Sequence, residues 1–160
     1  MKVVAIFLVV LCLAAIAGLG WLYLNSNLTV SFAQVIATDP VTQPEAFSTV
    51  KNGIASDTFT GTRFVSGELG SPEDYLFYTW TVHLENNSFL PARVIEMRIT
   101  PMSGDVLVLG DMTEHSLSPH SSGDLSVTAL TARSMHSVRE AVVTWYVWGL
   151  PFSARLTLGR

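Results

Sequence analysis

The strictest pattern in this sequence is an alternation of apolar and polar residues that begins near Tyr75. Every even-numbered position from 76 to 84 is apolar, and the odd-numbered positions turn polar after Phe77. Successive side chains of a β-strand point to opposite faces, so a period of two indicates a strand with one buried face. The segment therefore predicts a strand whose even-numbered side chains lie in a core: Leu76, Tyr78, Trp80, Val82 and Leu84.

A second alternation follows after a polar break. Residues 86–88 (Asn-Asn-Ser) end the first run, and Pro91 restricts the backbone where the second begins. From there Ile95, Met97 and Ile99 share one face. Two alternating runs separated by turn residues are typical of a β-hairpin. We therefore expect residues 75–99 to form a hairpin.

Further segments carry strand patterns of the same kind. Together with the two just described they span residues 28–36, 59–65, 75–85, 93–99, 105–109, 125–129, 141–148 and 152–158. In the first of these, Leu28, Val30 and Phe32 share a face. The longest irregular stretch is residues 38–58, where Pro44 is placed to open a short helix. Short strands joined by turns favour an antiparallel sandwich. The sequence predicts an all-β fold, an Ig-like antiparallel β-sandwich of seven to eight strands, preceded by one N-terminal transmembrane helix.

The N-terminal segment Val3–Leu24 contains no charged residue. As a helix it would be about 33 Å long, enough to cross a hydrocarbon core of roughly 30 Å. Trp21 and Tyr23 stand at its end, where aromatic side chains favour the membrane interface. Lys2 precedes it and the next basic residue is Lys51, so the positive-inside rule places the N-terminus in the cytoplasm and the rest outside.

A cleaved signal peptide is the competing interpretation of this segment. Residues 15–17 (Ala-Ile-Ala) match a cleavage site, and residues 3–13 match a short hydrophobic region. Apolar residues continue past that site through Leu24, so cleavage would leave an apolar end on a soluble protein. We therefore expect residues 1–24 to be an uncleaved membrane anchor that contacts membrane lipid through Val3–Leu24. Residues 25–27 are then a juxtamembrane linker, and residues 28–160 form an extracytoplasmic domain. The protein is expected in the cell membrane.

Charge and cysteine content exclude several classes of protein. The net charge is −4 and only 14% of residues are charged, against about 25% in an ordinary soluble domain. Nucleic-acid binding needs clustered positive charge, so no nucleic-acid partner is expected. The lone cysteine, Cys12, lies inside the apolar segment and leaves no intrachain disulfide.

The sequence contains only fragments of the patterns that metal-binding or catalytic sites require. His115 and His120 are five residues apart with Asp111 and Glu114 beside them, but a zinc site needs three or four converging ligands. The acidic loop that holds Glu68, Glu73 and Asp74 lacks the spacing of a calcium loop. No G-x-S-x-G motif is present. We expect no catalytic residue, metal, cofactor or small-molecule substrate, and therefore no enzyme.

The turn and strand punctuation of the C-terminal half resembles a known family. The motifs are residues 85–88 (Glu-Asn-Asn-Ser), 90–94 (Leu-Pro-Ala-Arg-Val), 104–107 (Gly-Asp-Val-Leu), 117–119 (Leu-Ser-Pro), 123–127 (Gly-Asp-Leu-Ser-Val) and the closing turn 148–152 (Trp-Gly-Leu-Pro-Phe). Over about residues 75–158 the chain resembles the β-sandwich domains of the group-2 late-embryogenesis (water-stress) proteins and their bacterial Ig-like cousins. The resemblance implies a non-catalytic module without catalytic or ligand positions.

The preferred hypothesis is a membrane-anchored Ig-like module for protein–protein interaction or assembly, whose partner is another protein. The segment at residues 141–148 is rich in aromatic residues, and aromatic residues are enriched where interfaces concentrate their energy. Only one of Trp145 and Trp148 can share a face with the core, since they are three positions apart. The candidate interaction surface is therefore Tyr146, Trp148 and Trp145. A stress-protective module, and a small secreted metal-binding or hydrolytic domain, are the alternatives.

Overall fold

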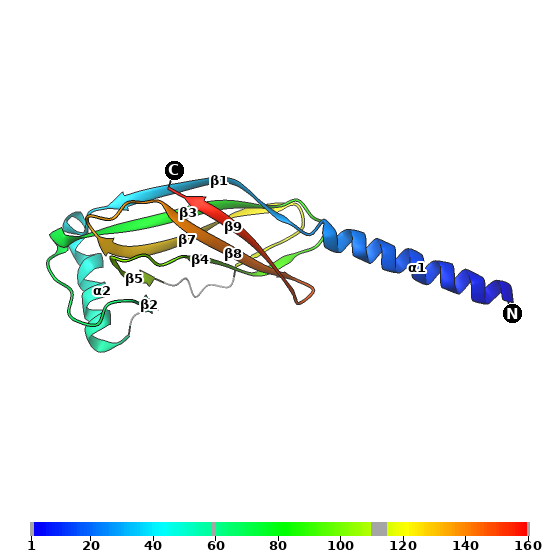
Figure 1. Ribbon diagram of the computed structural model, residues 1–160, viewed down its shortest axis with the longest axis horizontal. Helices are drawn as coiled ribbons and strands as arrows, with labels where there is room; N and C mark the ends of the chain where they lie inside the picture. The colour runs from blue at the N-terminus through cyan, green and yellow to red at the C-terminus, as the bar shows by residue number, and fades with distance from the viewer. Residues whose placement is uncertain (1, 59, 110–114, 160) are drawn as a thin grey trace.

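The computed structural model places a β-sandwich at the end of a long N-terminal helix (Figure 1). It describes residues 2–58, 60–109 and 115–159. Met1, Phe59, Asp111, Glu114 and Arg160 lie outside the described residues.

In the described part of the chain, nine strands form two antiparallel sheets. The five-stranded sheet has the order β1 (Leu28–Thr38), β3 (Tyr75–Asn86), β7 (Ser121–Ala132), β5 (Asp105–Leu109) and β2 (Gly61–Arg63). The four-stranded sheet has the order β6 (His115–Leu117), β4 (Ala92–Ile99), β8 (Arg139–Val147) and β9 (Leu150–Leu158). The helices are α1 (Lys2–Leu24) and α2 (Pro44–Ser56), with short 3₁₀ turns η1 (Pro40–Thr42) and η2 (Pro72–Asp74).

The predicted all-β sandwich with an N-terminal apolar helix is confirmed. Each expected strand segment contains a strand, and β6 is an additional one in a segment expected to be a polar loop. The even-numbered face of β3 is buried as predicted, with Trp80 and Val82 fully enclosed. That face packs against residues of the other sheet, among them Ile95 and Val143.

The predicted hairpin over residues 75–99 is wrong. β3 pairs with β1 and β7, whereas β4 pairs with β6 and β8 in the other sheet. The connection between them crosses from one sheet to the other around the buried side chain of Asn86, whose Nδ2 donates to the carbonyls of Leu90, Leu117 and Ser118. Its Oδ1 accepts from the backbone N–H and the hydroxyl of Ser88. These polar residues supply the hydrogen bonds of buried backbone groups where the chain crosses between the sheets, and they do not form a hairpin turn.

The expectation that Phe32 shares a face with Leu28 and Val30 is also wrong. The pairing of β1 with β3 shifts between Val30 and Phe32, which places Phe32 opposite His83. An extra residue in a strand moves every later side chain to the other face. Phe32 is 50% exposed and its ring stacks on that of His83, with the centroids 5.5 Å apart.

Helix α2 occupies much of the stretch expected to be irregular. Phe47, Val50 and Ile54 recur at helical spacing and are buried against Leu107 and Leu130 on the outer face of the five-stranded sheet. Pro44 begins the helix, and Asp57 ends it in a left-handed conformation. The apolar stripe gains more from burial than the Asn52-Gly53 pair costs in helix propensity.

A buried ion pair joins the two sheets beside the central tryptophan. Arg139 Nη2, at the start of β8, donates to Asp105 Oδ1, at the start of β5, over 2.8 Å, and both side chains are fully enclosed. The guanidinium lies 5.7 Å from the centroid of the Trp80 ring and also donates to the carbonyls of His136 and Val138. The pair therefore fixes the two sheets relative to one another.

Helix α1 projects from one end of the sandwich (Figure 1). Among the described residues its segment Val3–Leu24 is one candidate membrane span, long and apolar enough to cross a bilayer and not covered by the rest of the chain. Its last turn contacts the sandwich. The rings of Tyr23 and Phe152 have centroids 4.8 Å apart, and Trp145 Nε1 donates to the carbonyl of the buried Ser26 over 3.3 Å.

We predict that Asp105→Asn destabilises the fold by roughly 3–5 kcal/mol, because it leaves the Arg139 guanidinium buried without its counter-charge. Denaturant unfolding of the full-length protein in detergent measures the loss. The matched control is Asp124→Asn on the exposed partner of His83, where the change should stay within about 1 kcal/mol. Equal losses in the two variants would contradict the role of the buried pair.

Candidate interaction surface

The three residues predicted to form an interaction surface occupy different environments. Trp145 is buried in the core, where its ring stacks on that of Phe152 with the centroids 5.8 Å apart. Trp145 is therefore not part of an exposed surface, which corrects its place in the predicted set. Inward positions of β8 are odd-numbered, so Tyr146 and Trp148 fall on the exposed side.

Tyr146 lies on the outer face of the four-stranded sheet. Its neighbours in register are Arg93 on β4 and Pro151 on β9, and Thr144 is the next outward residue along β8. Arginine and threonine neighbours make this a solvated face with an isolated aromatic ring. Residues 38–58 do not cover this strand, because α2 packs on the other sheet.

Trp148 stands in the tight turn between β8 and β9. Val147 and Leu150 pair across that turn, and Trp148 and Gly149 have φ values of 52° and 77°. Two consecutive residues with positive φ form the type I′ turn that suits a two-residue hairpin, where asparagine and glycine are the preferred residues. Trp148 is 55% exposed. Its ring therefore serves neither the core nor the turn.

Sequence reasoning missed the free edge of β1. Among the described residues β1 pairs with β3 alone, so its other edge carries unpaired backbone groups. The strand has 11 residues without a charge or a proline. Phe32 and Ile36 project from it with 50% and 54% of their surface exposed.

The other strands that end a sheet in the described part of the chain are protected. β2 and β6 are each 3 residues long. β9 carries Pro151 and Arg155, which discourage strand addition. The free edge of β1 is therefore the edge that lacks these protections. The absence of charge over residues 28–38 is visible in the sequence, but that this strand lies at an edge is not.

The outer face beside β1 is flat and polar but uncharged over several rows. Ile36 lies beside Thr79, and Gln34 beside Thr81. The hydroxyls of Thr79 and Thr81 are hydrogen-bonded to those of Thr128 and Ser126 on β7, at 2.8 and 2.9 Å. We call this set the β1 surface: Phe32, Gln34, Ile36, Thr79, Thr81 and His83. Its hydroxyl groups are satisfied within the sheet, so covering it does not leave them unpaired.

The histidines do not form a metal site in the part of the chain that the structure describes. No group of three or more His, Cys, Asp or Glu side chains converges among the described residues. His83 Nδ1 lies 2.6 Å from Asp124 Oδ1, and the ring of His120 meets that of Phe89 edge-on with centroids 5.0 Å apart. Asp111 and Glu114, the suggested neighbours of His115, lie outside the described residues.

Comparison with known proteins adds no relative: neither the protein-family models nor the curated proteins match this chain. The resemblance to the water-stress domains stays a prediction.

We predict opposite outcomes for the two tryptophans of this region. Trp145→Ala should cost roughly 3–5 kcal/mol, because it empties a core position. Trp148→Ala should change the free energy of unfolding by no more than about 0.5 kcal/mol, because the Trp148 ring is exposed and does not pack in the core. Thermal and denaturant unfolding of both variants tests this, and a large loss for Trp148→Ala would show that its ring supports the fold.

Proposed function

We propose that this chain is a single-pass membrane protein that presents its β-sandwich outside the cell as a non-catalytic module for protein–protein interaction. The N-terminus is cytoplasmic and α1 is an uncleaved anchor. The observation that carries the proposal is the free edge of β1, which has no charged residue and borders the β1 surface with its exposed Phe32 and Ile36. The partner is an extended segment of another protein that adds to this edge.

The physical basis of the contact is strand addition. A partner strand that aligns with β1 pairs its backbone with the unpaired N–H and C=O groups of the edge, and these hydrogen bonds supply affinity. Alternate side chains of the partner then reach Phe32 and Ile36, which supply specificity through apolar contact. No charged group of β1 opposes the approach of a strand.

The anchor supports this function by restricting where the partner is met. Val3–Leu24 is continuous with β1 through residues 25–27 alone, so β1 begins at the helix exit and the β1 surface lies within the length of one strand from it. Lys2 before the span, with no basic residue after it until Lys51, favours a cytoplasmic N-terminus. The stress-protective alternative relies on general surface polarity, and the apolar residues of the β1 surface do not favour it.

We predict that the mature protein retains its N-terminal segment and stays in the membrane pellet after carbonate extraction, because Val3–Leu24 is long and apolar enough to span the bilayer. Immunoblotting of the fractions and N-terminal sequencing measure this. Protease added to sealed cells from outside should digest the sandwich. A mature N-terminus at Gly18 would instead establish a cleaved signal peptide.

We predict that a photoreactive residue placed at Ile36 in native membranes forms a covalent adduct with a protein partner. Phe32→Lys should abolish the adduct, because a lysine on an edge strand opposes strand addition while the fold is kept. The matched control is a photoreactive residue at Tyr146, which is exposed on the other sheet and should give no adduct.

Three results of this cross-linking are informative. Adducts at Ile36 with the mass of two copies would identify the partner as a second copy of this chain. Adducts at Tyr146 and none at Ile36 would move the contact to the four-stranded sheet. Adducts at neither position would contradict a contact made through either surface.

A further inference from the structure

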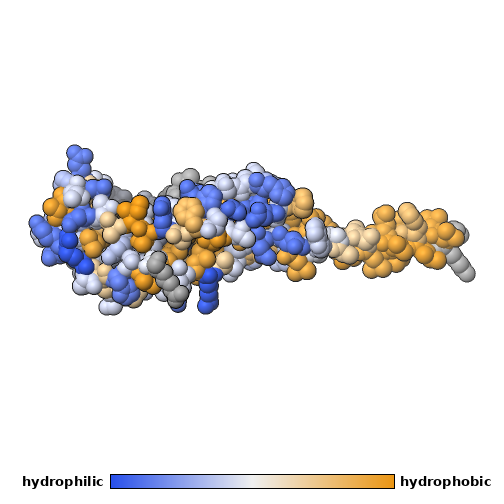
Figure 2. All heavy atoms as spheres, turned by 90° about the horizontal axis from the view of Figure 1, so that it is seen from above, coloured by the Kyte–Doolittle hydropathy of each residue, from blue (hydrophilic) through white to orange (hydrophobic). Residues whose placement is uncertain are grey.

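The connections at the helix-proximal end of the sandwich contain no Asp, Glu, Lys or Arg, and two of them carry exposed aromatic residues. They are residues 25–27, residues 87–91 between β3 and β4, residues 118–120 between β6 and β7, and the turn at 148–149. Phe89 is 63% exposed, Trp148 55% and Leu150 48%. Figure 1 shows the β8–β9 hairpin ending near the point where α1 leaves the sandwich, and Figure 2 shows hydrophobic residues beside hydrophilic ones at that end, with α1 itself hydrophobic.

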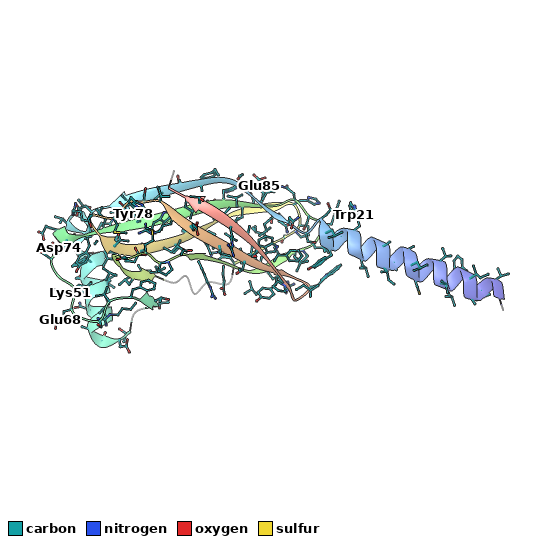
Figure 3. The ribbon with its side chains drawn as sticks, viewed as in Figure 1. Trp21, Lys51, Glu68, Asp74, Tyr78 and Glu85 are labelled. Atoms are coloured by element: carbon teal, nitrogen blue, oxygen red, sulfur yellow. The ribbon has the colours of Figure 1, made fainter. Side chains whose placement is uncertain are left out.

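The opposite end of the molecule has the reverse character. Lys51, Glu68 and Asp74 lie there, whereas Trp21 lies at the junction of α1 with the sandwich (Figure 3). Asp39 belongs to the same distal end, where it pairs with Arg133 at 2.9 Å. Hydrogen bonds from the Val41 backbone and from Arg133 hold the pKa of Asp39 below its usual value. The distal end thus carries several charged residues, whereas near the helix exit Glu85 and Arg93 lie on the strands and the connecting loops contain no Asp, Glu, Lys or Arg.

We propose that the Phe89 and β8–β9 loops insert into the interface of the bilayer that α1 spans, and so hold the sandwich against the membrane in one orientation. The ligand is the phospholipid surface itself, at the junction of headgroups and acyl chains. This inference rests on the proposed membrane anchor and adds a second lipid contact that the anchor alone does not provide.

The contacts of α1 set the depth of these loops. Tyr23, in the last turn of the span, packs on Phe152, which places Phe152 near the level of the interface. Leu150 precedes Phe152 by two residues, which corresponds to at most about 7 Å of extended strand directed toward the turn. The turn that carries Trp148 is therefore at the level of Tyr23 or deeper.

The loop that carries Phe89 is positioned in the same way. Asn86 pairs in register with Leu28, four residues after the end of α1, so the loop begins beside the helix exit. The buried Asn86 side chain then holds both Ser88 and Leu90 on either side of Phe89. An apolar ring is thus presented to the outside by a rigid, hydrogen-bonded loop.

The conformation of Trp148 gives independent support. A non-glycine residue with positive φ is strained, and such outliers are retained where the surroundings or the function require them. An asparagine would fit the turn better. Tryptophan is the side chain that membrane interfaces favour most, and its amphipathic ring suits the headgroup level. The bilayer interface accounts for a tryptophan at this position.

Site-directed spin labelling of the full-length chain in phosphatidylcholine vesicles tests the proposal. Native Cys12 serves as the label site within α1, and Cys12→Ser provides the background for single cysteines at Phe89, Leu150 and Lys51. Accessibility to oxygen relative to a water-soluble nickel complex reports depth in the bilayer. We expect the Phe89 and Leu150 labels to show a raised oxygen-to-nickel ratio. The Lys51 label, at the far end, should show the low ratio of a site exposed to water.

The outcomes separate this proposal from the anchor on which it rests. If the Cys12 label is embedded while the Phe89 and Leu150 labels are as accessible to nickel as the Lys51 label, the loop insertion is overturned and the anchor stands. If the Cys12 label is also accessible to nickel, both proposals are overturned.

A second variant, Trp148→Asn, tests the role of the Trp148 side chain while the spin label stays at Phe89. It relieves the turn, so the melting temperature should stay the same or rise, yet the oxygen-to-nickel ratio at the Phe89 label should fall. The effect should not depend on salt, because the loops contain no charge. An unchanged ratio in this variant would show that Trp148 does not take part in the lipid contact.

Discussion

The arrangement of the sandwich depends on the buried ion pair between Arg139 and Asp105. These residues begin strands in different sheets, and both side chains are enclosed beside Trp80. A displacement of one sheet over the other would separate the charges inside the protein, and an unpaired buried charge is strongly destabilising. The pair therefore sets the registration of the two sheets at the distal end, and the apolar faces between them supply the area that is buried.

Different interactions close the two ends of the sandwich. At the distal end, α2 covers the outer face of the five-stranded sheet through Phe47, Val50 and Ile54, and charged groups surround it. At the proximal end, Asn86 closes the core from within, and Tyr23 joins the helix to β9. The rigid proximal end continues into an apolar helix. We propose that the β1 surface binds a protein and that the proximal loops contact lipid.

Errors of the sequence-based predictions have a common cause in contacts between distant segments. The polar residues after β3 resemble a hairpin turn, yet Asn86 is satisfied by carbonyls more than thirty positions away, at Leu117 and Ser118. The exposure of Phe32 follows from a shift in pairing that only the partner strand reveals. Residues 44–56 form a helix because the five-stranded sheet offers an apolar surface to their stripe. Local pattern carries no information about these surfaces.

The sequence by itself determined the fold class, the apolar helix and the buried face of β3, because burial of one face imposes a period that local residues must follow. It also determined that Trp145 and Trp148 differ in exposure, since alternation excludes a shared face. Tertiary structure alone decided which of the two is buried and which strands pair. It also decided that β1 is an edge and that the uncharged loops surround the helix exit. Such relations depend on the packing of the two sheets, which joins residues far apart in the chain.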